Sequence, residues 1–369
     1  MKKYDVAAFV WPSYTGDEPR TRMFWPKGEG EWQTVKEATK IYDEHEWPRK
    51  PLWGYVNEAD PAVMEMQIEE AAKHGINVFL YDWYWYDNRP FLAQCLENGY
   101  MQARNNDKVK FYLMWANHTA TTLWYKQLAH EDIPIWNGAV DKKTFAYIVA
   151  LTIEKYFSYP SYYKIGGKPA YMIFSIPQFV KGLGGVDEAL EALRYFREET
   201  KRAGFPGLSL QACIFNEKHR AEMLDEKTDV LDFIALAELD GVTYYNFENF
   251  APMNRTYPEI LEDVKREWHK IEQSVKAPFI PQVSLGWDNT LRFAVQQKKW
   301  LCYENTPENV EKGFRLARDY IDAHPEAEAP LVVVNSWNEW TEGSYLEPDD
   351  LNGYGYLEAA KRVFVDENI

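Results

Sequence analysis

Short apolar stretches rich in Val, Ile, Phe and Tyr alternate along the chain with longer stretches in which apolar residues recur at helical spacing. The short apolar stretches predict strands, and the amphipathic stretches predict helices. Eight strands are predicted, at residues 5–11, 76–83, 109–116, 169–175, 208–214, 232–238, 279–286 and 330–337. Helices are predicted between them, at residues 61–74, 90–104, 141–157, 187–203, 256–274 and 307–323.

This alternation predicts an α/β fold in which eight βα units close into a single (β/α)8 barrel of the TIM type. Nearly continuous apolar strands suit a parallel sheet that is covered on both faces. The connection after the first strand, residues 12–60, is long and rich in tryptophan. A long βα loop belongs to the active-site end of a barrel. No linker or repeat divides the chain, so residues 1–369 are predicted to form one catalytic domain.

Charge and motifs restrict the partners. The chain carries 41 Lys+Arg against 57 Asp+Glu, a net charge of -16, which repels nucleic acid and anionic membrane surfaces. Three scattered cysteines have no metal or redox spacing. The sequence also lacks a P-loop, a GxGxxG, an HExxH and an Asp-x-Asp motif, so we expect no metal ion and no cofactor. No pattern in the chain predicts an oligomeric state.

The first residues do not resemble a targeting signal. They contain two lysines, then an acidic residue, and no apolar run of the length that a signal peptide needs. As it stands, the sequence therefore indicates a cytoplasmic protein. A protein whose leader has been removed would instead be periplasmic or secreted.

Polar and aromatic residues follow several of the predicted strands. In a barrel these positions face one shared pocket. Amides and carboxylates hydrogen-bond sugar hydroxyls, and indole rings stack on a pyranose face, so we expect an oligosaccharide or polysaccharide ligand. The candidate binding residues are Asp82, Trp83, Trp85, Asn117, His118, Glu238, Trp287, Asp288, Asn289, Trp337, Asn338 and Trp340.

The segment NSWNEWTEGSYLEPDD after the last strand contains two closely spaced acids, Glu339 and Glu342. Cleavage of a glycosidic bond generally needs two carboxyl groups, one of which protonates the leaving oxygen. Three residues of separation would let both acids serve one site and perturb each other's pKa values. Glu339 and Glu342 are the predicted catalytic pair, and Arg292 is expected to be a buried partner of Asp82 or Asp288.

Seven motifs along the chain resemble the glycoside hydrolase family 99-like proteins, which overlap the WbsX-type domain once labelled a glycosyltransferase. They are GEGEW, PLWGY, GINVFLYDWYWYD, FYLMWANH, YYKIGGKPAYMIF, PQVSLGWDNTLR and NSWNEWTEGSYLEP. Family 99 enzymes are retaining endo-acting α-mannosidases with a Glu-x-x-Glu pair after a strand. The resemblance implies that Glu339 takes the proton of the substrate 2-hydroxyl, whose oxygen then forms a 1,2-anhydro sugar. Glu342 would act as general acid and then as general base.

Attack by the 2-oxygen requires it to lie opposite the leaving group, as it does in α-mannosides and in α-L-rhamnosides. The sequence therefore predicts a glycoside hydrolase for one of these two linkages. Two alternatives stay open. One is a glycosyltransferase of polysaccharide biosynthesis, which would need a nucleotide diphosphate site, and the other is a carbohydrate-binding barrel without catalysis.

Overall fold

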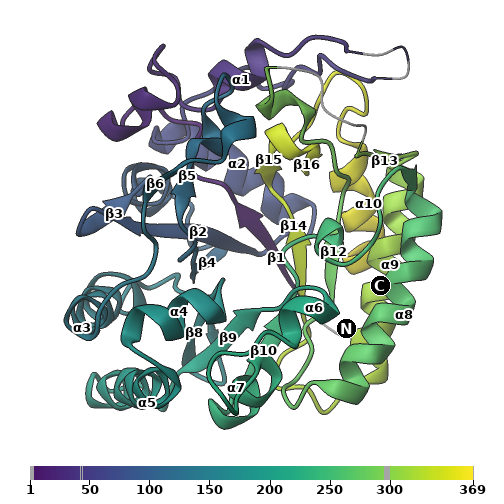
Figure 1. The fold of residues 1–369 in the computed structure, drawn as a ribbon. Coiled ribbons are helices and arrows are strands. Elements are labelled where there is room, and N and C mark those ends of the chain that lie inside the picture. The colour runs from purple at the N-terminus through teal and green to yellow at the C-terminus, as the bar shows by residue number, and fades with distance from the viewer. Residues whose placement is uncertain (1–3, 42, 44, 295–299, 369) are drawn as a thin grey trace.

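The computed structural model describes residues 4–41, 43, 45–294 and 300–368. Within these residues, eight parallel strands form a central sheet that curls into a barrel with helices between the strands (Figure 1). The strand order around the barrel is β10-β9-β8-β4-β2-β1-β14-β12. The strands are β1 (Asp5–Val10), β2 (Val78–Tyr86), β4 (Lys110–Trp115), β8 (Lys168–Ile173), β9 (Ser209–Cys213), β10 (Gly241–Thr243), β12 (Gln282–Ser284) and β14 (Leu331–Asn335).

The last gap in the barrel lies between β10 and β12, and one parallel bridge spans it. Val242 pairs with Phe279, its N–H donates to Pro278 O at 2.9 Å, and its carbonyl accepts from Ile280 N at 2.8 Å. Because β1 pairs with β14, the two ends of the chain also close the sheet. The predicted (β/α)8 barrel is confirmed, as a nearly closed one.

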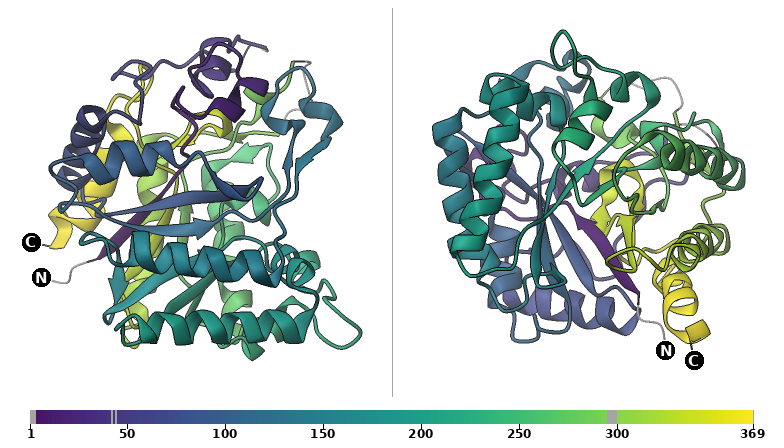
Figure 2. Two further views of the ribbon diagram at one scale, coloured as in Figure 1. Left: turned by 90° about the vertical axis from the view of Figure 1, so that its left-hand side faces the viewer. Right: turned by 90° about the horizontal axis from the view of Figure 1, so that it is seen from below.

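Helices surround the strands on the outside of the barrel (Figure 2). The long first connection, with the short helix α1, lies over the end of the barrel at the top of Figure 1. The helices are α1 (Trp32–Lys36), α2 (Pro61–Lys73), α3 (Lys142–Leu151), α4 (Ile176–Leu183), α5 (Val186–Arg202), α6 (Glu217–Arg220), α7 (Val230–Leu236), α8 (Tyr257–Ser274), α9 (Pro307–Ala323) and α10 (Gly355–Phe364). The short strands are β3 (Arg89–Phe91), β5 (Ala120–Thr121), β6 (Pro134–Trp136), β7 (Lys164–Ile165), β11 (Arg255–Thr256), β13 (Cys302–Tyr303), β15 (Asn338–Glu339) and β16 (Ser344–Tyr345).

The predicted sixth strand at 232–238 is wrong, because this segment lies largely in helix α7. The Asp229 side chain caps the helix by accepting from Asp232 N at 2.8 Å. Val230, Phe233 and Ile234 are buried at helical spacing, so the apolar run is one face of a helix. The sixth strand of the barrel is β10, which begins at Gly241.

The predicted helix at 90–104 is also wrong. β2 instead turns back into β3 through Asp87 and Asn88, both with positive φ (54° and 57°), the geometry of a type I′ hairpin. Only short helical turns follow, at Cys95–Gly99 and Tyr100–Gln102. The other five predicted helices are present with small changes at their ends, although the last turns of 141–157 widen into Thr152–Phe157.

Candidate active site

Glu339 and Glu342 lie on one tight hairpin after the eighth strand of the barrel. Glu339 ends β15 and pairs with Ser344 of β16, and a single helical turn, Trp340–Glu342, connects the two strands. Gly343 closes the turn in the left-handed region (φ 64°), which favours glycine. The hairpin therefore fixes both carboxyl groups at the carboxyl end of the barrel.

The Arg292 guanidinium joins the two carboxyl groups. Its Nη2 donates to Glu339 Oε1 at 2.7 Å, and its Nη1 donates to Glu342 Oε1 at 2.5 Å. Its Nε lies 3.4 Å from Oε1 of a third acid, Glu31. All four side chains are buried or nearly so. The sequence predicted that Arg292 pairs with Asp82 or Asp288, whereas it binds both members of the catalytic pair and Glu31.

Tyr245 extends this network to Asp82. The tyrosine hydroxyl lies 3.0 Å from Asp82 Oδ2 and 3.1 Å from Glu339 Oε2. A single O–H can donate to only one of them. Burial raises the pKa of Asp82 well above its usual range, so a protonated Asp82 can donate to Tyr245 while Tyr245 donates to Glu339.

The two carboxyl groups differ in their surroundings. Both Glu339 oxygens have hydrogen-bond donors, and this residue is 2% exposed. Glu342 is 9% exposed, and its Oε2 has no hydrogen-bond partner in the described part of the chain. Burial raises the pKa of both groups, and the charge of Glu342 raises that of Glu339 further, while Arg292 acts in the opposite direction. The two carboxyl groups therefore titrate together, and the oxygen without a hydrogen-bond partner belongs to Glu342.

Glu31 attaches the long first loop to this site. Its carboxylate accepts from Trp11 Nε1, from Ser13 Oγ at 3.2 Å and from Thr341 Oγ1 at 3.0 Å. The neighbouring Gly30 has φ 61°, and a Cβ there would lie 1.9 Å from Ser13 O. Glu31 thus links the first loop to the turn that carries the catalytic pair. Sequence reasoning did not select Glu31, although it lies in the GEGEW motif.

A second carboxyl pair lies beneath the hairpin. Glu58 accepts from Asn338 Nδ2 at 2.9 Å, and Glu347 accepts from Trp340 Nε1 at 2.6 Å. Gln67 Nε2 lies 3.2 Å from Glu58 Oε1 and 2.7 Å from Glu347 Oε1. Burial raises the pKa of Glu58 to about 7 and that of Glu347 well above its usual range. These acids hold the two residues that flank Glu339.

The predicted tryptophans on β2 point away from the barrel mouth. Side chains alternate along a strand, so Asp82 points inward while Trp83 and Trp85 point outward. Trp83 Nε1 donates to Tyr156 Oη at 3.2 Å, and the Trp85 ring lies 5.7 Å from that of Tyr147 on α3. Both indoles are buried against helices, so the prediction that they stack on a sugar is wrong.

Trp337 and Trp340 are likewise fully buried. The Trp337 ring lies 5.0 Å from Phe79, and Trp340 stacks on Tyr345 with centroids 3.8 Å apart. With no exposed surface, neither ring can contact a ligand, and their predicted role in sugar binding is wrong. They fill the space under the catalytic hairpin instead.

Two predicted amides connect loops. Asn117 donates to Ser175 O at 2.9 Å and accepts from Ser175 N at 2.8 Å, which joins the loops after β4 and β8. Asn338 makes the same pair of bonds with the Trp11 backbone, at 2.9 and 2.8 Å. Both amides are buried and engaged with backbone, so they position the loops that surround the site.

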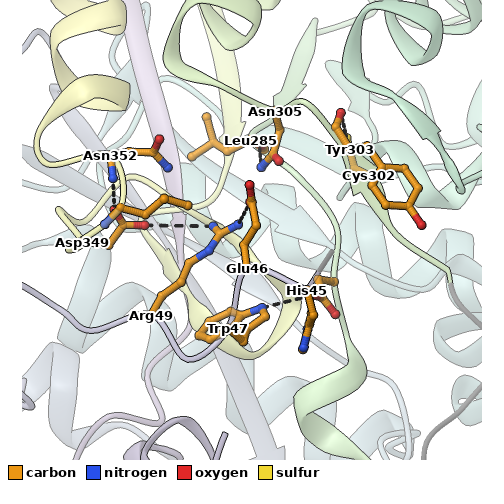
Figure 3. A network of polar contacts seen from close by, with 12 residues as sticks. His45, Glu46, Trp47, Arg49, Leu285, Cys302, Tyr303, Asn305, Asp349 and Asn352 are labelled. Carbon is orange, nitrogen blue, oxygen red and sulfur yellow. Dashed lines mark hydrogen bonds and ion pairs between the residues drawn. The ribbon is translucent and has the colours of Figure 1, made fainter. Parts of the chain in front are cut away.

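Asp288 anchors the first loop to the seventh. Its Oδ2 lies 2.9 Å from His45 Nε2 and 3.0 Å from Trp47 Nε1, and its N–H donates to Glu342 O at 2.6 Å. Figure 3 shows this segment, in which Arg49 lies between Glu46 and Asp349. Asp288 therefore supports the backbone of Glu342.

The remaining candidates near the mouth are Trp287, Asn289 and His118. Trp287 is 8% exposed, and its Nε1 has no hydrogen-bond partner among the residues that the structure describes. Asn289 and His118 are partly exposed, and Asn289 precedes the turn that carries Arg292. Burial lowers the pKa of His118, which keeps its ring neutral near pH 7. These side chains lie where they could contact a ligand.

Glu238 does not belong to the site. It follows helix α7 and precedes β10, so it lies at the amino end of the barrel, and it is exposed. The residue that takes its expected place on the sixth unit is Tyr245, which follows β10. Glu238 was assigned to the site because the sixth strand was predicted several residues too early. The end of that predicted strand therefore lies at the amino end of the barrel and not at the carboxyl end.

Neither a metal site nor a membrane span is found in the described ranges. No group of three or more His, Cys, Asp or Glu side chains there could hold a metal ion. No helix of the same residues has the length and apolar character to cross a bilayer.

Residues 6–360, nearly the whole chain, match the family model described as "Glycosyltransferase WbsX". The chain belongs to the WbsX family. The chain is also 25% identical over 375 residues to the uncharacterized protein WxcX from two strains of Xanthomonas campestris pv. campestris. The alignment covers 97% of this chain and 49% of WxcX, so the chain spans about half the length of these relatives.

Among solved structures, the WbsX barrel is similar to a GH99 endo-alpha-mannosidase from Bacteroides thetaiotaomicron. The TM-score is 0.61 at 16% identity, over 98% of this chain and 96% of the other. A glycoside hydrolase-like protein gives a TM-score of 0.60 at 18% identity, over 99% and 94% of the two chains. At these identities the similarity concerns the fold alone, a barrel of the (β/α)8 type. The resemblance noted from the sequence motifs is confirmed.

Replacing Arg292 with Met should destabilise the WbsX barrel. Three buried carboxyl groups lose their common cation, and breaking a buried ion pair typically costs about 3–5 kcal/mol of unfolding free energy. Urea denaturation at neutral pH, followed by tryptophan fluorescence, measures this loss. The matched control is Arg104→Met, because Arg104 pairs with Glu65 on the surface, where solvent screens the pair. Equal losses of unfolding free energy in the two variants would show that the buried network contributes no more than a surface ion pair.

The Glu58 pair should make stability depend on pH. Its folded pKa of about 7 lies above the usual 4.5, so the folded state holds the proton more tightly than the unfolded chain. The resulting stabilisation is complete below about pH 4.5 and is lost as the pH rises through about 7. Glu58→Gln keeps nearly the same shape and one acceptor oxygen without titrating, so its melting temperature should fall less than that of the wild type between pH 5 and 8. Glu358→Gln on the exposed face of α10 should keep the wild-type slope, and a wild-type slope in Glu58→Gln would contradict the assignment.

Proposed function

We propose that this WbsX-family protein is a retaining glycoside hydrolase that cleaves an α-linked glycan of the α-mannoside or α-L-rhamnoside type. The observation that carries the proposal is the pair Glu339 and Glu342 on a single guanidinium at the carboxyl end of the barrel, with one buried oxygen of Glu342 that has no hydrogen-bond partner among the described residues. Two acids in one site with unequal surroundings are what acid–base cleavage of a glycoside needs. That residues 1–369 form one catalytic domain stays a prediction.

The first step would form the 1,2-anhydro sugar. Glu339 takes the proton of the 2-hydroxyl as its oxygen attacks the anomeric carbon. The bond from that carbon to the leaving oxygen breaks, and Glu342 supplies the proton that the leaving oxygen needs. The glycan thus leaves as an alcohol, and the protonation states of Glu339 and Glu342 have exchanged.

The second step would reverse these roles. Glu342, now ionised, removes a proton from a water molecule that attacks the anomeric carbon from the face vacated by the leaving group. The 2-oxygen leaves that carbon and regains its proton from Glu339. Two inversions at the anomeric carbon give net retention, and both acids return to their starting states.

The hydrogen-bond partners of the two acids support this division of roles, which requires the shared proton to lie on Glu342 although the charge of Glu342 raises the pKa of Glu339. Donors from Arg292 and Tyr245 to both oxygens stabilise an ionised Glu339, which a base requires. Glu342 receives one side-chain donor, from Arg292, and its other oxygen is unbonded within the described chain. A protonated Glu342 can therefore direct its proton toward a ligand oxygen.

The family description supports glycosyl transfer as a second candidate. A transferase would have to bind the diphosphate of a nucleotide sugar. Arg292, which lies beside the catalytic pair, is already paired with three carboxylates, which leaves none of its own charge for phosphate. Tight, metal-dependent binding of nucleotide sugars in a calorimetric titration would favour the transferase over the hydrolase.

Glu342→Gln should reduce hydrolysis by about 100-fold or more, because general acid–base catalysis typically contributes a factor of about 10²–10⁴. Glu339→Gln should do the same, because the 2-hydroxyl then loses its base. The assay follows the reducing ends released from a panel of α-manno- and α-rhamno-oligosaccharides. Glu238→Gln is the matched control, since this exposed glutamate lies at the other end of the barrel, and its turnover should equal the wild-type value.

The stereochemistry is tested separately by recording proton NMR spectra in the first minutes of the reaction. The initial product should have the α configuration. A β product would reject participation of the 2-oxygen. Equal, low rates for wild type and Glu342→Gln on the whole panel would instead indicate a carbohydrate-binding barrel without catalysis.

A further inference from the structure

Four partly exposed ring side chains follow neighbouring strands of the barrel: His118 after β4, Phe174 after β8, Phe215 after β9 and Tyr245 after β10. The Phe174 ring centroid lies 5.5 Å from that of His118, 5.3 Å from Phe215 and 5.7 Å from Tyr245. We call these four residues the ring wall. Unlike the buried tryptophans, its members keep exposed surface at the carboxyl end of the barrel.

One end of the ring wall lies at the carboxylate pair, where the Tyr245 hydroxyl is 3.1 Å from Glu339. At the other end, Phe215 contacts the His219 ring with centroids 4.6 Å apart. His219 lines a hollow of about 730 Å³ between α4 and the segment that follows α6, two elements that lie in the lower half of Figure 1. The ring wall therefore connects the acids with a hollow on the same end of the barrel.

The hollow has the chemistry of a sugar site. Its volume falls within the range of about 300–1,000 Å³ that is common for small-ligand sites. Its polar lining includes both donors and acceptors, as sugar hydroxyls require. Burial lowers the pKa of His219, so its neutral ring can donate and accept. The side chains that carry these properties are Ser175, Gln178, Lys181, His219 and Glu222.

The charges in the hollow balance. Lys181 and Glu222 are the charged side chains among its described lining residues, one of each sign. A neutral sugar unit fits such a site better than a phosphorylated or carboxylated one. Ring faces along the path suit the apolar C–H face of a pyranose.

We propose that the hollow is a remote binding site for a neutral glycan chain, which reaches it along the ring wall from the carboxylate pair. The inference rests on the proposed function for the identity of the glycan. With this site the protein binds long chains more tightly than short ones, because sugar units several positions away from the cleaved bond also contact it.

Binding is the first test and uses the full chain with Glu342→Gln, so that the ligand survives. Calorimetry compares α-linked disaccharides and hexasaccharides of the manno and rhamno series. The hexasaccharide of the active series should bind roughly tenfold more tightly than its disaccharide. Phe215→Ala and His219→Ala, each added to Glu342→Gln, should each remove roughly three- to tenfold of this gain, the size of an aromatic contact. Tyr195→Ala, which removes an exposed ring on α5, is the matched control and should keep the gain.

Turnover provides the second readout. Phe215→Ala and His219→Ala should lower kcat/KM for the hexasaccharide more than for the disaccharide, whereas general structural damage would lower both equally. Melting temperatures identify any variant that fails to fold, and the other variant then decides. Equal binding of short and long chains in both series, or no binding of any hexasaccharide, would overturn the remote site.

The two proposals can fail separately. Length-dependent binding without any turnover would keep the remote site and reject the hydrolase. Turnover with no dependence on chain length would keep the hydrolase and reject the remote site.

Discussion

The site depends on one buried cation that faces more negative charge than it can neutralise. Arg292 contacts Glu31, Glu339 and Glu342, and all of them are shielded from water. Three ionised carboxylates around one guanidinium would leave unpaired charge in a medium of low dielectric, which is costly. The network is therefore stable only when it retains a proton. A retained proton beside an ionised neighbour is the state in which an acid–base pair operates.

The surplus of negative charge around Arg292 also restricts which ligands can bind. Asp82 and Glu248 add further acids near this mouth, and the charge of Glu248 raises the pKa of Glu342. A uronate or phosphate group placed here would be repelled by acids whose one guanidinium is already shared among three of them. Neutral sugars carry no such penalty. The charge pattern thus favours neutral glycans before any specific contact is considered.

Much of the fold could be predicted from the sequence, because each strand is a local pattern. The carboxylate pair was also local, since both acids lie in one turn. The position of the tryptophans on β2 could also have been predicted from the sequence. Alternation along β2 places Asp82 and Trp83 on opposite faces, so both could not have lined the pocket. Abundant indole rings fill the layer between strands and helices, whereas Phe174, Phe215 and Tyr245, which follow the strands, keep exposed surface.

Other parts of the site had no local signal. Glu31, Tyr245 and Arg292 come from three different loops, and only the closed barrel brings them to Glu339. Tyr245 was further hidden by the amphipathic helix α7, whose apolar face resembles a strand. Glu58 and Glu347 are far apart in the chain, yet they support the residues on both sides of Glu339. A perturbed acid pair of this kind lies under the site rather than in it. Strong pKa shifts therefore indicate the neighbourhood of the chemistry, and contact with the barrel mouth decides which acids take part.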